Sequence, residues 1–108
     1  GAFPLWLAPT QVAIVPISND KHTDYAEKVY KTLRNAGIRA NLDDRSESMN
    51  YKIREALQDK KIPYVVVIGD KEIEEGSVAI RKRGEGPVGS LKVEEFLSKI
   101  EKEIKDRV

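Results

Sequence analysis

Apolar and polar residues follow one another along this chain in blocks, and the period of the pattern changes from one block to the next. Residues 12–17 and 64–68 are two short apolar runs rich in β-branched side chains, and neither contains a charged residue. A run without alternation is typical of a strand that is covered on both faces. Residues 38–42 alternate between apolar and polar positions, which predicts a strand with one solvated face.

Three other segments have helical spacing. Apolar residues recur at i, i+3, i+4 and i+7 across residues 21–36, from Met49 to Leu57, and across residues 93–104. Gly37 provides a left-handed stop for the first helix. The ring of Pro63 excludes helical geometry from the residue before it, so the second helix must end there.

The segment between the last two of these blocks contains turn residues and one further strand. Glycines at both ends of residues 69–76 predict a turn. Residues 78–83 alternate as a strand that places Arg81 and Arg83 on one face. Residues 84–89 are rich in glycine and predict a loop.

This β-α-β-α-β-β-α order, with right-handed crossovers, predicts a mostly parallel sheet with helices on both faces and one antiparallel strand. The 108 residues suffice for one core, so residues 1–108 are expected to form a single domain. Ligands of such sheets bind at the carboxyl ends of the strands, where the strand order reverses. The charged segments 43–47 and 69–72 would then share one rim.

Composition narrows the function classes. No apolar run is long enough to span a membrane, so a membrane protein is not expected. Cysteine is absent, which excludes disulfides and thiolate chemistry and fits a reducing cytoplasm. The net charge is only +1, so any binding of nucleic acid must depend on local clusters of charge.

Candidates for catalysis are few. Asp43 and Asp44, at a strand end, could hold a divalent cation or accept a phosphoryl group, as in a small flavodoxin-like enzyme or phosphoacceptor. His22 is the only histidine, and without a partner it is expected to be a surface or cap residue. The segment after the first strand, residues 16–20, has no glycine, which disfavours nucleotide-triphosphate chemistry.

The remaining charged residues suit binding. Arginine can bond phosphates or guanine edges with two donors, and a carboxylate can accept from base amino or imino groups. A rim that mixes arginine and carboxylate groups suits single-stranded RNA. The alternative is that these residues form only a solvated charged face, which has the same composition. The residues concerned are Lys52, Arg54, Lys71, Glu72, Arg81, Lys82 and Arg83.

Six segments, in order and across almost the whole chain, resemble the C-terminal anticodon-binding domain of threonyl-tRNA synthetases. They are "GAFPLWLAP", "AGIRA", "DDRSE", "YKIREA", "KIPYVVVIGDKEIEEGSVAIRKR" and "GSLKVEEF". The "GDKE" turn also occurs in the prolyl, histidyl and glycyl relatives, so the domain of another class II synthetase is the alternative. The resemblance implies an α/β fold of three layers, with a mixed five-stranded sheet and three helices, one strand more than the pattern shows.

The same resemblance implies that the domain reads the G and U of the threonine anticodon. Arg81 of "VAIR" and Glu72 of "GDKE" keep the family's residues, whereas Ser46 stands where the family usually has asparagine. Asn50 replaces a usual glycine before "YKIR", and asparagine tolerates the same left-handed geometry. The expected RNA-binding set is completed by four cations: Lys52, Arg54, Lys71 and Arg83.

The resemblance also implies what lies outside the chain. The catalytic domain, with its ATP and zinc, would be upstream, so this domain is expected to have no catalytic residue, metal or cofactor of its own. Its partner would be the anticodon loop of a threonine tRNA, and the parent enzyme would be a cytoplasmic homodimer. The first two residues continue the family's entry sequence, which predicts an excised domain.

Overall fold

The computed structural model describes residues 2–108; Gly1, the first residue of the expected entry sequence, lies outside them. Five strands form one mixed sheet in the order β2-β1-β3-β4-β5. β1 pairs in parallel with β2 and β3, and β4 pairs antiparallel with β3 and β5. The strands are β1 (Val12–Pro16), β2 (Ala40–Leu42), β3 (Tyr64–Ile68), β4 (Ser77–Lys82) and β5 (Gly86–Lys92).

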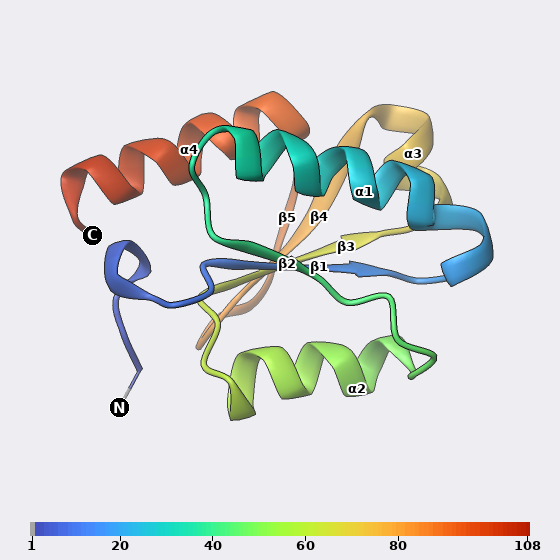
Figure 1. The fold of residues 1–108 in the computed structure, drawn as a ribbon, viewed down its shortest axis with the longest axis horizontal. Coiled ribbons are helices and arrows are strands. Elements are labelled where there is room, and N and C mark those ends of the chain that lie inside the picture. Colours follow the sequence, from blue (N-terminus) through green and yellow to red (C-terminus); the bar gives the residue numbers. More distant parts are fainter. Residues whose placement is uncertain (1) are drawn as a thin grey trace.

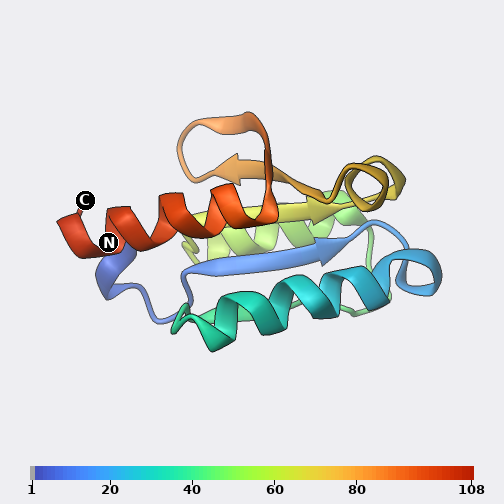
Figure 2. The same ribbon diagram turned by 90° about the horizontal axis from the view of Figure 1, so that it is seen from above.

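Helices cover both faces of this sheet, which gives three layers (Figure 1). α1 and α4 lie side by side on one face, with the β4–β5 hairpin extending beyond α4, and α2 lies on the other face (Figure 2). None of the helices in residues 2–108 has the length and apolar character needed to cross a membrane. The helices are η1 (Leu5–Leu7), α1 (Asn19–Asn35), α2 (Met49–Arg54), its π-helical continuation η2 (Glu55–Asp59), α3 (Asp70–Glu75) and α4 (Val93–Asp106).

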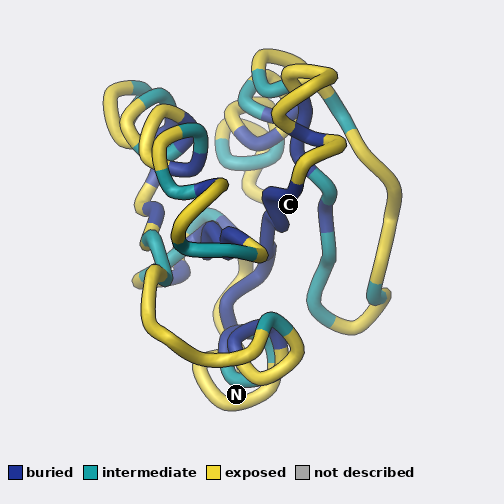
Figure 3. The backbone as a smooth tube through the Cα atoms, turned by 90° about the vertical axis from the view of Figure 1, so that its right-hand side faces the viewer, coloured by how far each residue is buried: buried dark blue, intermediate teal, exposed yellow. Residues whose placement is uncertain are grey.

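The sheet separates two apolar layers. The larger layer lies between the sheet and α1 and α4, where the rings of Tyr64 and Phe96 meet edge to face at 6.0 Å. The smaller layer lies under α2 and contains Val65 and Val67. Every residue of β1 and β3 is buried, as their unbroken apolar runs predict, whereas β5 at the sheet edge is mostly exposed (Figure 3).

The structure confirms the three-layer α/β fold with five strands and corrects two local expectations. The predicted loop at residues 84–89 is wrong for residues 86–89, which belong to strand β5 (Gly86–Lys92), because an edge strand beside a bulge tolerates glycine and proline. Residues 70–75 form the short helix α3, so four α-helices flank the sheet where three were expected. Gly76 ends α3 in the left-handed conformation, at a φ of 64°.

Candidate nucleic-acid interface

The strand order reverses between β1 and β3, because β2 lies on the other side of β1. Ile17 follows β1, and its N–H donates to the carbonyl of Ile68 at 2.8 Å, so the two strand ends stay together. Gly69 and α3 follow β3 at the same end of the sheet (Figure 1). Such a reversal is the usual place for a ligand site in an open α/β sheet.

A hollow of about 360 Å³ adjoins this point on the face of the sheet that carries α2; we call it the rim hollow. Glu72 and Arg81 both line it, so the structure brings together the two residues that the resemblance assigns to base reading. The complete lining is Ile17, Met49, Val67, Glu72, Ala79, Ile80, Arg81, Pro87, Gly89 and Ser90.

Glu72 contributes an oriented acceptor to the rim hollow. The residue is only 7% exposed, and its Oε1 accepts a hydrogen bond from the Gly69 N–H at 2.7 Å. Among residues 2–108, Oε2 has no such donor and can accept from a ligand. A Cβ at position 69 would lie 3.2 Å from Glu72 Oε1 and 2.7 Å from Cδ1 of Ile17, so glycine makes this close arrangement possible.

Arg81 contributes the donors. Within residues 2–108 its guanidinium makes no hydrogen bond or ion pair with another side chain, and the residue is half-buried. The register between β4 and β5 shifts between Ile80 and Arg81, where Ile80 pairs with Gly89 and Arg81 pairs with Pro87. A bulge of this kind re-aims the neighbouring side chain. The planar fork of Arg81 is therefore available to a ligand.

Apolar surface completes the rim hollow. Ile17 is 52% exposed although it is a large hydrophobic residue, and Met49 and Pro87 also line the hollow. A flat ring can lie on such side chains while its edge reaches the carboxylate of Glu72 and the guanidinium of Arg81. This combination of an apolar wall, one acceptor and one forked donor suits an unstacked nucleobase.

Ser46 lies in an exposed loop that leads directly to Met49. Nδ2 of Asn19 holds this loop by donating to the carbonyls of Asp44 at 2.7 Å and Arg45 at 3.2 Å. These bonds tie the loop to the start of α1, and Ser46 is exposed.

Lys71 and Arg54 are the exposed cations of the expected set. Lys71 lies on α3 and Arg54 on α2, and neither side chain has a hydrogen-bond or ion-pair partner within residues 2–108. Both side chains are free to meet a phosphate, and their two helices also contribute Met49 and Glu72 to the lining of the rim hollow.

Two expected contact residues are placed differently. Lys52 is 2% exposed, and its ammonium donates to the carbonyl of Asp43 at 2.9 Å, so it points into the protein and not toward a phosphate. Arg83 lies at the opposite end of the sheet, because β4 runs antiparallel to β3 and ends beside Pro63. Its guanidinium donates to the carbonyl of Phe3 at 3.0 Å and also to that of Lys61.

The carboxylate of Asp43 is already engaged. Arg45 donates to both of its oxygens at 2.8 Å, and this hydrogen bonding lowers the pKa of Asp43. The same guanidinium also donates to Glu55 at 2.6 Å. Asp44 remains exposed, and no three metal-ligating side chains converge anywhere in the described chain. The phosphoacceptor alternative therefore depends on Asp44 alone.

His22 is buried, which the sequence did not indicate. It is 4% exposed; its Nδ1 accepts from the Ser18 N–H at 2.9 Å, and its Nε2 lies 2.8 Å from Oδ1 of Asp70. Its acidic partner is 48 residues away along the chain, so no local pattern could have shown the pair.

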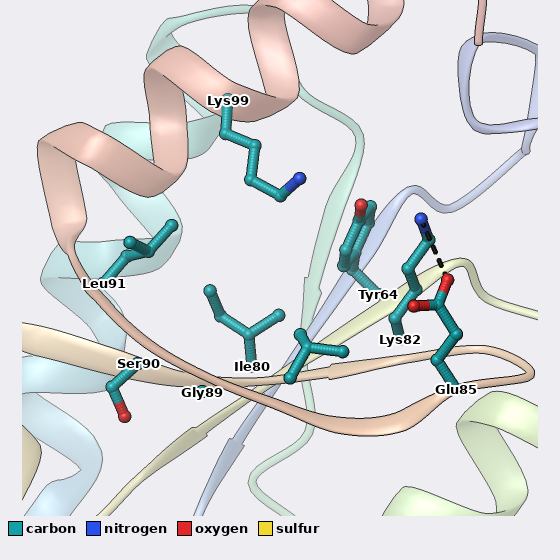
Figure 4. A pocket seen from close by; sticks show the side chains of 9 residues that line it. Tyr64, Ile80, Lys82, Glu85, Gly89, Ser90, Leu91 and Lys99 are labelled. Atoms are coloured by element: carbon teal, nitrogen blue, oxygen red, sulfur yellow. Dashed lines mark ion pairs between the residues drawn. The ribbon is translucent and has the colours of Figure 1, made fainter.

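A second hollow, of about 270 Å³, lies on the other face between α4 and the β4–β5 hairpin (Figure 4). Its two lysines flank the ring of Tyr64, at 5.8 Å for Lys82 and 6.0 Å for Lys99. Lys82 is paired with Glu85 at 3.2 Å and Lys99 with Glu103 at 2.7 Å. Because carboxylates balance both ammonium groups, this hollow suits an RNA phosphate less well than the rim hollow and its neighbouring cations do.

Comparison with known proteins shows the family of this chain. The family described as the anticodon binding domain matches residues 11–103. The threonine–tRNA ligase of Desulforamulus reducens is 53% identical over 99% of this chain, and that of Streptococcus pyogenes serotype M3 is 56% identical over 93%. The chain spans only 16% and 15% of the lengths of these two relatives.

Solved structures show the same fold. The RNA-binding domain of threonyl-tRNA synthetase from Cryptosporidium parvum Iowa II superimposes with a TM-score of 0.86, over 94% of this chain and 25% of that chain, at 29% identity. A prolyl-tRNA synthetase from Cryptosporidium parvum, complexed with halofuginone and AMPPNP, has a TM-score of 0.83 over 97% of this chain and 22% of that chain, at 26% identity. The matched residues, the identities and the shared fold together show that this chain belongs to the anticodon-binding-domain family and is, within it, the domain found in threonine–tRNA ligases.

Proposed function

We propose that this domain reads the G and U of a threonine anticodon in the rim hollow. The observation that carries the proposal is that Glu72 and Arg81 line the same hollow with a free acceptor and a free donor. Its family membership and its threonine–tRNA ligase relatives support RNA as the ligand.

Each residue has a distinct part in the proposed reading. The fork of Arg81 donates to the O6 and N7 acceptors of guanine, which adenine does not present together. Oε2 of Glu72 accepts from a base imino or amino group, while Oε1 stays on the Gly69 amide. Ile17 and Met49 support the ring faces.

The remaining residues act at the edge of the bound loop. Lys71 and Arg54 neutralise phosphates, which positions the RNA without reading its sequence. Ser46 can donate and accept one hydrogen bond but lacks the two-sided amide of asparagine, so its contact with a base is the weakest of the set. With so few free cations, the affinity of the isolated domain falls with rising salt concentration with the slope expected for roughly two to four neutralised phosphates.

The parent protein, in this proposal, is a threonine–tRNA ligase that works in the cytoplasm as a homodimer. The domain supplies tRNA recognition, and the ATP and zinc of the ligation reaction belong to the rest of the enzyme. The sequence has no glycine-rich phosphate loop after β1.

Binding assays with anticodon stem-loops test the proposal. Loops from threonine, proline and histidine tRNAs would be titrated against the domain at one fixed salt concentration. We expect the threonine loop to bind most tightly. Equal affinity for the three loops would contradict base reading, and a preference for the proline loop would favour the domain of a prolyl enzyme, whose fold is also similar.

A further inference from the structure

His22 fixes the first residue of α3 to α1. The backbone N–H of Ser18 can only donate, so Nδ1 of His22 must be the acceptor in their 2.9 Å contact. A neutral imidazole then has its proton on Nε2, which donates to Oδ1 of Asp70 at 2.8 Å. This hydrogen bond lowers the pKa of Asp70 and keeps it ionised. The ring is thus an oriented donor between the start of α1 and the start of α3.

Tyr25, one turn along α1, holds the chain directly after α3, at the first residue of β4. Its hydroxyl donates to the carbonyl of Ser77 at 2.9 Å, just beyond the glycine that ends α3. Burial, and then the nearby carboxylates of Glu72 and Glu94, raise the pKa of Tyr25, so the hydroxyl keeps its proton. His22 and Tyr25 are three residues apart and therefore share one helix face.

Contacts with other elements support α3; besides these two, the ammonium of Lys92 donates to the carbonyl of Glu75 at the last residue of α3. A helix of six residues is not stable alone in water, because nucleation is costly and few bonds repay it. The starts of α1 and α3 lie next to each other at the carboxyl end of the sheet (Figure 1). Glu72 lies between the two anchored points, and its carboxylate faces the rim hollow. Neither His22 nor Tyr25 lines that hollow.

We propose that His22 and Tyr25 are positioning residues which, by holding the start of α3 and the chain directly after it, fix the carboxylate of Glu72 for base discrimination. The effect on base discrimination rests on the proposed function. The effect on Glu72 can be measured without RNA, because loss of either anchor should disturb the hydrogen bond between the Gly69 amide and Glu72.

Asp70→Ala is the central variant, because the Asp70 side chain is 82% exposed and its removal leaves no core cavity. Asp70→Asn keeps an oxygen that can accept from His22 and removes only the charge. Glu74→Ala is the matched control, since Glu74 is an exposed acid on the same helix. Tyr25→Phe removes only the hydroxyl at the other anchor.

Two readouts separate positioning from general stability. The first is the NMR shift and exchange rate of the Gly69 amide proton without RNA. The second is the ratio of affinities for a threonine loop and the same loop with its G replaced by A. We expect Asp70→Ala and Tyr25→Phe to change the Gly69 signal and to reduce this ratio about three- to tenfold, the factor that corresponds to one weakened hydrogen bond. Asp70→Asn and Glu74→Ala should keep the ratio within about twofold of the native value.

Each other result has a definite meaning. An unchanged Gly69 amide in Asp70→Ala would overturn the inference. So would a variant that loses affinity for both loops equally, because the anchors would then be purely structural. If the Gly69 amide changes but the native domain does not distinguish the two loops, the proposed function fails and the positioning of Glu72 is upheld.

Discussion

Replacement of Lys52 by methionine distinguishes a buried structural cation from an RNA contact. Methionine keeps most of the apolar stem and removes the ammonium that donates to the Asp43 carbonyl at 2.9 Å. A lost charge-assisted hydrogen bond costs about 1.5–3 kcal/mol, and relief from burying a charge offsets part of it, so the net loss is about 1–2 kcal/mol. For a domain of this size that corresponds to a fall in Tm of roughly 4–9 °C.

Arg54→Met is the matched control, because Arg54 is an exposed cation on the same helix. It should leave Tm within about 2 °C of the native value, since exposed substitutions change stability little. It should also reduce the salt slope of RNA binding by about one phosphate, which Lys52→Met should not do. Thermal unfolding and titrations at several salt concentrations provide both measurements. A Lys52→Met variant with native Tm and a reduced salt slope would refute the buried position of Lys52.

Three further predictions concern the core, the loop beside the rim hollow and catalysis. Phe96→Ala should lower the free energy of unfolding by about 3–5 kcal/mol in urea titrations, because the ring is fully buried against Tyr64, whereas the half-exposed Val88→Ala should change it by less than about 0.5 kcal/mol. Arg45 lowers the pKa of Asp43 and of Glu55, so its bonds to these carboxylates stabilise the folded domain above the pKa that they have in the unfolded chain, about 4. This stabilisation is lost as the pH falls through their lower pKa values in the folded domain. Arg45→Gln should therefore be less stable than the native domain at pH 7, and a difference in urea midpoint that did not shrink by pH 3 would contradict this pairing. The domain alone should show no threonine-dependent exchange of pyrophosphate, because its sequence has no glycine-rich phosphate loop; exchange by the pure chain would refute the assignment.

The buried strands and long helices follow from the sequence because their patterns have physical causes. Residues 64–68 contain no charged residue because helices cover both faces of β3, and the strand has these bounds in the structure. α3 did not follow, because six residues are too few to show a helical period. β5 did not follow either, since glycine and proline interrupt most strands and are tolerated at this sheet edge.

The candidate site was partly predictable for related reasons. Strand topology and motif resemblance place Glu72 and Arg81 on one surface, and the structure brings them together in the rim hollow. Local pattern does not show that Lys52 points inward, because its partner is a backbone carbonyl nine residues away. Nor does it show that Arg83 lies at the opposite end of the sheet, where its partners are the carbonyls of Phe3 and Lys61.

Base discrimination by Arg81 tests the central claim most directly. The native domain, Arg81→Ala and Arg81→Lys would be titrated at fixed salt against a threonine loop containing the G and U and against the same loop with A in place of the G. We expect Arg81→Ala to lose about 1–3 kcal/mol of discrimination, the worth of a two-pronged base contact in duplex DNA, applied here to RNA. Lysine should restore only part of this loss, because a point charge cannot reproduce the planar fork. If Arg81→Ala instead weakens binding to both loops by the same factor, Arg81 only positions the RNA, and the proposed base reading in the rim hollow is wrong.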